Sequence, residues 1–325
     1  MISVELINDL EEGRALWHRH WPQQCLFDLW PLRVIFMTAF DRQPLFIKAL
    51  RNGQVEGLLA LAWIEEEGYF GHFPGETWNA KTWIEQNRIV ASSPPVATEL
   101  LAAVPGPFHL RYLKRSSMIS SESQEPDEIN YSMRPAQYDC SFANYLEQFG
   151  GKTRKKLLSE VDKFKKSELT FRFDHLPDIE AMFKLNLKAF GTTSYFYDQR
   201  FLKAFERLAA WLSEEKLLRV TTILIKGKIA AIDMSAVWRN CGMVLAGGTN
   251  PDFPGIAKLI NLHHIERACN EKLETVDFLC GDFNWKERFH LHRQQLYKLY
   301  DPQISASPSG ILEKTKIRND EKKHG

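Results

Sequence analysis

The amino-acid sequence predicts an α+β fold of two similar lobes, each with a mixed, mostly antiparallel sheet flanked by helices. Residues 45–75 and 219–255 share one pattern of strand, glycine turn, long strand, second glycine turn, third strand and a Pro-Gly loop. The turns at Gly53 and Gly68 recur 174 residues later. Glycine turns between apolar runs predict hairpins, because glycine accepts the positive φ of a primed turn. Because this offset far exceeds any solenoid period, it indicates two lobes rather than a repeat array. The alternative is chance recurrence of glycine turns.

Apolar periodicity and cap residues place the other elements. The N-terminal helices are anchored by Trp17, Trp21 and Trp30, and Pro94-Pro95 begins a later helix. In the second copy of the repeat, the second turn is expected at Cys241-Gly242. The expected helices lie at residues 6–20, 27–40, 94–104, 142–149, 157–164, 177–190, 199–216 and 256–272. The expected strands outside the repeat lie at residues 108–114, 129–134, 169–173, 276–280 and 295–300.

The chain is predicted to divide near residue 135. Residues 1–135 form the N-terminal lobe, which we expect to be a degenerate copy, and residues 136–304 form the C-terminal lobe. Residues 305–325 lack apolar periodicity and are predicted to be a disordered tail.

Composition indicates a cytoplasmic globular protein. The 325 residues are 44% apolar and 26% charged, with a net charge of +1 that argues against a general nucleic-acid coat. The longest apolar stretch, Leu58–Ile64, is too short to span a bilayer. The N-terminal residues MISVELINDLEEGR are acidic where a signal peptide is basic and then apolar. Five scattered cysteines without a CxxC pair indicate reduced thiols. We expect no membrane span, and a monomer.

A loop with Pro-Gly leads into the helix predicted at residues 256–272. A helix N-terminus presents unpaired N–H groups and positive dipole charge, and Gly255 lets the backbone approach a ligand closely. Gly255, Ile256, Ala257 and Lys258 are therefore candidates for holding a pyrophosphate. The alternative is a plain strand-to-helix loop ended by proline.

Four stretches of the second lobe resemble a known family in that family's order. They are residues 150–164, 224–238, 250–268 and 277–290. The last is the most specific, since a strand followed by Gly-Asp, an aromatic-Lys pair and Arg-Phe is typical of the family. The positions concerned are Gly281, Asp282, Trp285, Lys286, Arg288 and Phe289. Over residues 138–300 the sequence resembles the two-lobed GNAT-like acyltransferases, of the BioF-like or CelD-like acetyltransferase type, which are related to Fem-type aminoacyl ligases.

The resemblance implies transfer of an acyl group from acyl-CoA, or from aminoacyl-tRNA in the Fem branch, to an amine. It places a pyrophosphate at Gly255 and the turn after it, and matches Arg154 and Lys155 to the family's basic positions. Lys286 is then an electrostatic stabiliser or phosphate contact, the alternative being an ordinary solvated lysine. Trp285, Asp282 and, in the first lobe, Trp78 are expected to bind substrate. Acyl-CoA is expected as a co-substrate, with no tightly bound cofactor.

Two further residues are candidates for proton transfer. Asp233 lies within an otherwise apolar strand, which is unfavourable unless it faces a cavity or is paired. It is either a general base or the partner of a buried cation. Tyr197 is either a general acid or a residue of the core or rim, and the same holds for Tyr195.

A run of seven cations marks the predicted helix that begins the second lobe: Lys152, Arg154, Lys155, Lys156, Lys163, Lys165 and Lys166. It is either a solvated face or a site for an anionic ligand such as a nucleotide phosphate, a lipid-linked saccharide or a tRNA acceptor stem.

No metal site is expected, because His263-His264 and His290-x-His292 lack acidic or cysteine companions at ligand spacing. The sequence thus predicts an N-acyltransferase that moves an acyl group from acyl-CoA to a small-molecule amine of the amino-sugar or amino-acid type, in cell-envelope or polysaccharide biosynthesis. The alternatives are a Fem-like ligase dependent on aminoacyl-tRNA, and a non-catalytic accessory protein of polysaccharide biosynthesis.

Overall fold

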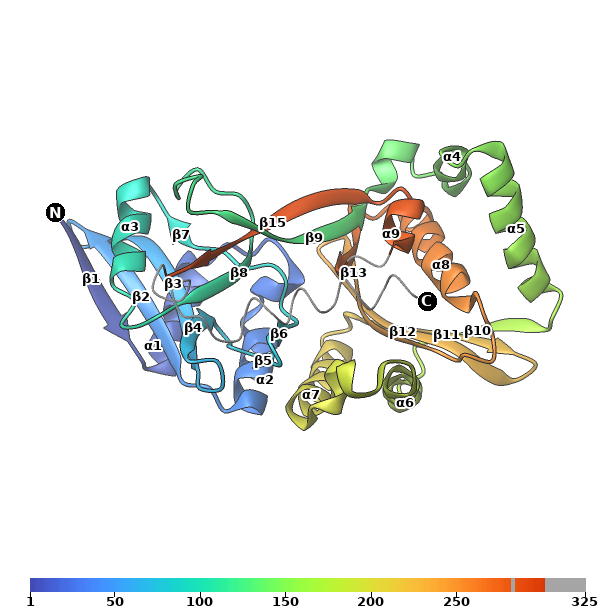
Figure 1. Cartoon of the computed structure of the whole chain (residues 1–325), viewed down its shortest axis with the longest axis horizontal. Helices are drawn as coiled ribbons and strands as arrows, with labels where there is room; N and C mark the ends of the chain where they lie inside the picture. The colour runs from blue at the N-terminus through green and yellow to red at the C-terminus, as the bar shows by residue number, and fades with distance from the viewer. Residues whose placement is uncertain (282–283, 302–325) are drawn as a thin grey trace, which may run out of the picture. The chain divides into compact units, whose positions relative to one another are not determined.

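The computed structural model describes residues 1–281 and 284–301 (Figure 1). The chain forms two compact units. The N-terminal unit comprises Met1–Pro22, Phe36–Asp127 and the chain from Leu296, and the C-terminal unit comprises Gln23–Ile35 and Glu128–Gln295. The chain therefore passes between the units at four points, where the sequence prediction has one. The lobe boundaries at residues 135 and 304 stay predictions, and the predicted tail, 305–325, lies outside the described residues.

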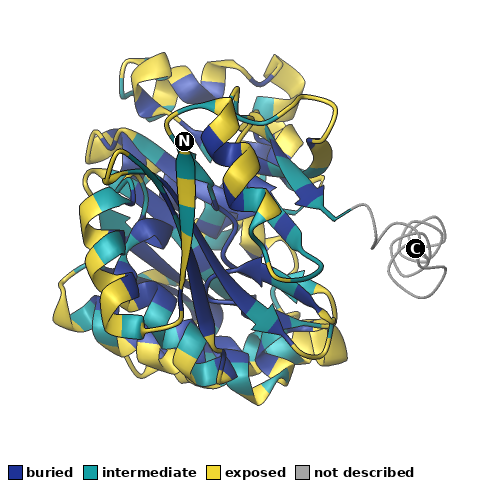
Figure 2. Ribbon diagram, turned by 90° about the vertical axis from the view of Figure 1, so that its left-hand side faces the viewer, coloured by how far each residue is buried: buried dark blue, intermediate teal, exposed yellow. Residues whose placement is uncertain are grey.

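The N-terminal unit is built on an antiparallel sheet with the strand order β1-β2-β3-β4. Its strands are β1 (Ile2–Ile7), β2 (Pro44–Arg51), β3 (Gln54–Ile64) and β4 (Tyr69–His72), and β7 (Val90–Ala91) also pairs with β3. The helix α3 (Pro94–Ala102) packs on β2 and β3. In Figure 2 the strands of this unit are coloured mainly as buried and the outward faces of its helices as exposed. The other elements are α1 (Leu10–His20), a 3-10 turn (Leu26–Asp28), α2 (Trp30–Phe40), β5 (Thr77–Trp78), β6 (Lys81–Thr82) and β8 (His109–Leu113).

The predicted helix at residues 6–20 begins too early. The first residues form β1, and α1 begins at Leu10, because the Asp9 side chain accepts a hydrogen bond from the Glu12 N–H at 2.7 Å and caps the helix. Alternation in β1 packs Ile2 and Val4 on the apolar core of this unit. The strand therefore belongs to the sheet, as an edge strand.

The C-terminal unit repeats the element order of the N-terminal unit. Its strands β10 (Leu169–Phe173), β11 (Leu218–Ile225), β12 (Lys228–Trp238) and β13 (Cys241–Thr249) are antiparallel neighbours, and β14 (Thr275–Cys280) lies next to β13 in parallel. Figure 1 shows α6 (Asp178–Phe190) and α7 (Gln199–Glu214) on one face of this sheet and α8 (Ile256–Asn270) on the other. The unit also contains α4 (Phe142–Glu147), α5 (Gly151–Lys165), α9 (Trp285–Arg288) and 3-10 turns at Pro135–Tyr138, Gly191–Thr193 and Tyr195–Tyr197.

Strand register repeats between the units at the offset of 174 residues. Leu50 is paired with Val55 in the first copy, and Leu224 with Ile229 in the second. Both hairpins carry a register shift at the same place, between residues 49 and 50 and between residues 223 and 224. Both turns have two residues with positive φ, at 52–53 and 226–227. The predicted duplication is thus present in the backbone, and the α+β class of two mostly antiparallel lobes is confirmed.

The second turn of the later copy was predicted two residues too far along the chain. Arg239 and Asn240 adopt positive φ and form the turn, whereas Cys241 and Gly242 already belong to β13. The corresponding turn of the first copy is longer and includes Gly68 at φ 72°. Gly242 has a packing role, since a Cβ there would lie 3.1 Å from Leu273 Cδ1.

Two long strands, β9 (Glu125–Met133) and β15 (His292–Tyr300), contribute residues to both units. In the C-terminal unit, β9 pairs with β14 through Met133 and Val276. In the N-terminal unit, β15 pairs with β8 through Tyr297 and Leu113, and Leu299 joins the buried core. The remaining predicted elements agree with the structure to within four residues at their ends, except the helix predicted at residues 157–164, because α5 already begins at Gly151. In the described ranges, no helix has the length and apolarity needed to cross a membrane.

Candidate active site

The candidate donor site is the loop between β13 and α8. Asn250 anchors the loop, since its N–H donates to Ala230 O at 2.8 Å and its side chain to Ile229 O at 3.2 Å. Gly255 caps α8 with φ 90°, a conformation that L side chains rarely adopt. A Cβ at Gly255 would meet nothing closer than Phe164 Cζ at 4.0 Å, so the residue is required for its φ and not for space.

The first turn of α8 offers fewer free donors than an isolated helix end. The Ile256 N–H donates to Phe253 O and the Lys258 N–H donates to Gly255 O, both at 3.1 Å. Within the described chain, the Ala257 N–H is left as the donor of this turn without a backbone acceptor in the loop. A phosphate at this end would therefore rely on Ala257, the helix dipole and neighbouring cations.

Lys258 is held by α5. Its Nζ donates to Glu160 Oε2 at 2.5 Å, and this hydrogen bond holds the pKa of Glu160 below its usual range. Arg154 and Lys155 lie on the same helix, five to six residues before Glu160, which is about 9 Å or less along the axis. Neither forms an ion pair within the described chain. The structure thus brings the predicted basic helix to the side of the loop, with Glu160 competing for Lys258.

The strands β13 and β14 are paired only at their beginnings. The parallel register covers Cys241–Met243 against Thr275–Asp277, after which β13 continues to Thr249 without a register partner on β14 among the described residues. A bulge adds Leu245 to β13, since Val244 is paired with Ser235 and Ala246 with Met234. A bulge changes the direction of the strand, and this bulge follows directly after the last residue of β13 that pairs with β14.

Asp233 forms a buried pair with a histidine on α8. His264 Nε2 lies 2.9 Å from Asp233 Oδ2, and the two side chains are 5% and 8% exposed. The row of paired residues across the sheet places Thr221 on one side of Asp233 and Gly247 on the other. A side chain at position 247 would clash with Asp233, since a Cβ there would lie 2.1 Å from Asp233 Oδ1. Asp233 therefore faces α8, as the partner of His264.

Lys286 is fully buried at the end of β14. Its Nζ donates to Leu279 O at 2.8 Å and to Cys280 O at 2.7 Å, and lies 5.2 Å from the centre of the Tyr131 ring. With 2% of its surface exposed, it is not an ordinary solvated lysine. The ammonium group donates hydrogen bonds to two carbonyls at the end of β14. The folded chain therefore places a positive charge at this strand end.

Asp277 completes this strand end and was not predicted. Its Oδ1 accepts hydrogen bonds from Asn130 Nδ2 and from the Leu279 N–H, both at 2.8 Å. The second bond stabilises Leu279 at φ 61°, which turns the backbone toward Lys286. Phe278 packs edge-on against both His264 and Trp285. Its ring therefore lies between the Asp233–His264 pair and the residue that precedes Lys286.

The other predicted residues belong to other elements of the chain. Tyr197 belongs to a 3-10 turn that packs on α6 and α7, across the sheet from Asp233, and its side chain is 55% exposed. The hydrogen bonds from Asn186 Nδ2 to Gly247 O and from Ser194 Oγ to Asn186 Oδ1 tie that segment to β13. Trp78 lies in the N-terminal unit with Lys81 Nζ 5.4 Å from its ring centre. Asp282 lies outside the described residues.

Sequence reasoning noted Asp233 and His264 separately but could not join them, because they are 31 residues apart and in different layers. The sequence signal that marked Asp233 is an aspartate inside an apolar strand. Asp277, in the strand TVDFLC, has the same signal and could have been found by it. Among the described residues, no group of three His, Cys, Asp or Glu side chains could hold a metal ion.

Comparison with known proteins finds one matching domain and several similar solved structures. Residues 151–287, from α5 to α9, match the model of the acetyltransferase (GNAT) domain. A search of the curated proteins finds no match. FemX has a similar structure, with a TM-score of 0.58 and 10% identity over 91% of this chain and 96% of that one.

Two further solved structures are similar over nearly the whole chain. L-PGS from Bacillus licheniformis has a TM-score of 0.57 and 11% identity over 92% of this chain and 95% of that one. A tandem GNAT protein from the clavulanic acid biosynthesis pathway has a TM-score of 0.51 and 10% identity over 95% of this chain and all of that one. The chain thus carries a GNAT-fold, acyltransferase-like domain, in a fold that it shares with FemX and with a tandem GNAT protein. The finer likeness to the BioF-like and CelD-like type stays a prediction.

Proposed function

We propose that the protein is an N-acyltransferase that moves an acyl group from acyl-CoA to an amine of the amino-sugar or amino-acid type. The observation that carries this proposal is the parting of β13 from β14 beside a helix N-terminus capped by Gly255. Such a gap can take an extended thioester arm, while the helix end takes its phosphates. The match of residues 151–287 to an acetyltransferase domain supports the same reaction class.

In this proposal the donor phosphates bind at Ala257 and Gly255, with Arg154 and Lys155 adding positive charge. Lys258 contributes once an anion displaces Glu160, since the two groups compete for one ammonium. The acyl carbonyl lies near the bulge at Leu245, and the positive charge of Lys286 favours negative charge that develops nearby.

The chemical step is attack of the neutral amine on the thioester carbonyl. A C–N bond forms, the C–S bond breaks, and the CoA thiolate leaves and takes up a proton. The ammonium form of the acceptor must first lose its proton, and Asp233 is the proposed base, with His264 orienting its carboxylate at 2.9 Å. Trp285 and Asp282 are the proposed acceptor contacts, and the roles of Tyr197 as an acid and of Trp78 as an acceptor contact stay predictions from the sequence.

Ligand-induced stabilisation tests the donor. We expect acetyl-CoA and free CoA to raise the unfolding midpoint of the full chain, and dephospho-CoA to do so as well, because the proposed cradle holds the pyrophosphate. The variant Gly255→Ala should lose this shift, while Gly150→Ala, at an open N-cap position of α5 with φ −51°, should keep it. Absence of any shift with millimolar CoA species would reject the proposed donor.

One observation favours a second candidate, a Fem-like ligase that takes its acyl group from aminoacyl-tRNA. Along α5, exposed lysines recur at helical spacing and form one stripe of about 21 Å. The stripe consists of Lys152, Lys156, Lys163 and Lys166. In the described chain none of these side chains forms an ion pair. A lysine stripe of this kind suits the phosphates of a nucleic-acid backbone.

The two candidates differ in what they bind. With tRNA as donor, changing Lys156 and Lys163 together to Gln should weaken binding of deacylated tRNA and lower its salt dependence by about two phosphate contacts. Activity should then be sensitive to RNase. With acyl-CoA as donor, the same variant should retain the CoA-induced thermal shift, and RNase should have no effect. A protein that responds to neither donor would instead fit a non-catalytic accessory role.

A further inference from the structure

The outward face of α5 carries a line of lysines that the proposed transfer from acyl-CoA does not use. These are the lysine stripe, Lys152, Lys156, Lys163 and Lys166, and all four residues are exposed. At 3.6 residues per turn, the four positions fall within about 80° of the helix circumference. On the opposite side of the helix, Leu157 and Val161 pack into the buried core together with residues of α8. The stripe therefore faces away from the core of the C-terminal unit.

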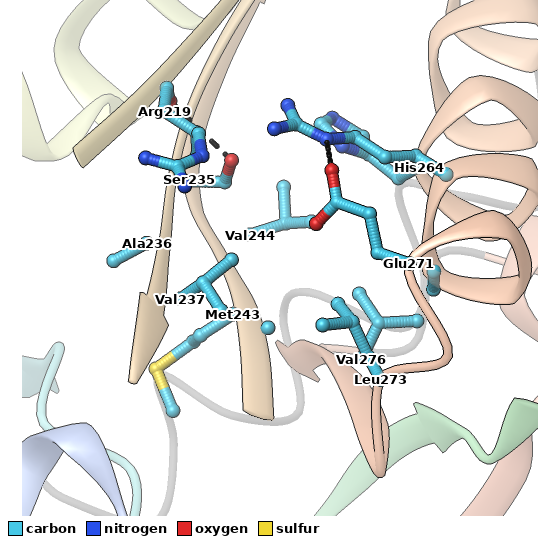
Figure 3. A pocket seen from close by; sticks show the side chains of 13 residues that line it. Arg219, Ser235, Ala236, Val237, Met243, Val244, His264, Glu271, Leu273 and Val276 are labelled. Atoms are coloured by element: carbon cyan, nitrogen blue, oxygen red, sulfur yellow. Dashed lines mark hydrogen bonds and ion pairs between the residues drawn. The ribbon is translucent and has the colours of Figure 1, made fainter. Parts of the chain in front are cut away.

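The stripe concentrates positive charge on a chain that is nearly neutral. The whole chain has a net charge of +1, whereas the stripe places four cations along about 21 Å of helix. Within the described ranges, none of the four ammonium groups has a carboxylate at ion-pair distance. Cations on α8 are paired: Lys258 with Glu160, and Arg267 with Glu271, a contact drawn as a dashed line in Figure 3. The stripe thus keeps its charge for a partner outside the chain.

The stripe and the donor loop lie on different sides of α5. Glu160 accepts a hydrogen bond from Lys258 Nζ at 2.5 Å, and Phe164 Cζ lies 4.0 Å from a Cβ placed on Gly255. These two positions of α5 lie roughly 75° and 115° round the helix from the middle of the stripe. A large partner that covers the stripe therefore leaves the loop before α8 open.

The length and composition of this face indicate the chemistry of the partner. A small anion reaches one or two of the four lysines, so a partner that contacts all four is an extended anionic surface or polymer. Ser159 lies between the lysines, with Lys155 and Asp162 at the border, so the face has no arginine and no aromatic side chain. Arginine forks and aromatic stacking are frequent in nucleic-acid recognition, whereas lysines, as compact charges on flexible stems, suit headgroups in a fluid layer.

We propose that the lysine stripe docks the protein on an anionic lipid bilayer. In this contact α5 lies parallel to the bilayer surface with its four ammonium groups at the level of the lipid phosphates. The apolar side of α5 stays in the core of the protein, so the contact is electrostatic and peripheral. Each lysine near such a surface strengthens binding by about fivefold. Asp162, at the border of the stripe, opposes the attraction.

Co-sedimentation of the full chain with vesicles, without any acyl donor, tests this contact. We expect binding to vesicles of equal parts phosphatidylglycerol and phosphatidylcholine, none to pure phosphatidylcholine, and release by added salt. Changing Lys156 and Lys163 together to Gln should weaken binding to the anionic vesicles by about 25-fold, at about fivefold for each lysine. Lys203 and Lys216 are exposed, in α7 and just after it, on the other face of the sheet from α8 (Figure 1). Changing both of them to Gln is the matched control and should change binding little.

Asp162→Asn provides a test with the opposite sign. It removes the carboxylate at the border of the stripe, so the anionic vesicles should be bound about fivefold more tightly than by the wild type. This variant keeps the proposal testable if the double variant of the stripe does not fold, which a melting curve will show. Equal binding to both kinds of vesicle, equal weakening by the two double variants, or binding of deacylated tRNA in salt that releases the protein from vesicles would each overturn the proposal. None of these outcomes bears on the thermal shift with CoA, so the lipid contact and the proposed donor are tested separately.

Discussion

Replacing Gly247 by alanine should destabilise the C-terminal unit through Asp233. The added Cβ would lie 2.1 Å from Asp233 Oδ1 and 3.1 Å from its Cγ, so the carboxylate must move by more than 1 Å. That movement breaks the 2.9 Å contact with His264. Overpacking of this kind costs about 1–3 kcal/mol, and a lost hydrogen bond to a charged group about 1.5–3 kcal/mol. Alanine regains about 0.5–1 kcal/mol over glycine in a strand. We therefore expect a net loss of about 2–5 kcal/mol in the free energy of unfolding.

A double-mutant cycle in urea separates this cause from a general intolerance of β13. In an Asp233→Ala background the clash is absent, so Gly247→Ala should then be neutral or slightly stabilising. Asp233→Ala alone should cost about 1–3 kcal/mol, because it leaves His264 buried without its partner. Gly242→Ala is the matched control in β13, since its nearest neighbour is Leu273 and its effect should add to that of Asp233→Ala. An equal loss for Gly247→Ala in both backgrounds would refute the reasoning.

Three further predictions concern single residues. Burial lowers the pKa of His263 to about 4 from 6.5, so the unfolded chain binds a proton that the folded chain does not, and stability falls as pH decreases from 6.5 toward 4. His263→Phe, which keeps the stacking on Phe171, should make this loss shallower in urea midpoints at pH 7 and pH 5, whereas exposed His292→Gln should not. Lys286→Met keeps the aliphatic stem but loses both carbonyl contacts, and should lower the free energy of unfolding by about 2–4 kcal/mol. Lys286→Ala should lower it further, because it also leaves a cavity. A melting curve of the alanine variant identical to that of the wild type would show that the ammonium has no structural role. Gly255→Ala should cost about 1–2 kcal/mol from its φ of 90° alone, and an unchanged midpoint would mean that the cap relaxes.

The sequence was most informative where structure is set by neighbouring residues. The hairpin turns at residues 52–53 and 226–227 follow from glycine and its positive φ, so the first hairpin of each meander was predicted at its observed place. The strand β1 was missed because it is a short edge strand whose Leu6 is half exposed, which resembles the start of an amphipathic helix.

The candidate site was predictable only in its components. Asp233 stood out as a charge in an apolar strand, but its partner His264 is supplied by a helix that packs on the sheet. Lys286 was selected by resemblance, yet its acceptors are the backbone carbonyls of Leu279 and Cys280, and backbone groups have no signature in a sequence. For Tyr197 the sequence leaves both a proton-transfer role and a core or rim position open, since nearness in the chain does not reveal on which face of a sheet a side chain lies.

The pairing of β15 with β8 has a consequence for synthesis of the chain on the ribosome. Leu299 pairs with Leu110 and is buried in the core of the N-terminal unit, so that unit lacks a strand until β15 has been translated. Between residues 113 and 297, translation at about 5–20 residues per second takes about 10–40 s. During this time β8 presents an open edge, the kind of surface that pairs with other chains. A nascent chain of this protein therefore has a period of exposure to misassembly that ends only when β15 pairs with β8.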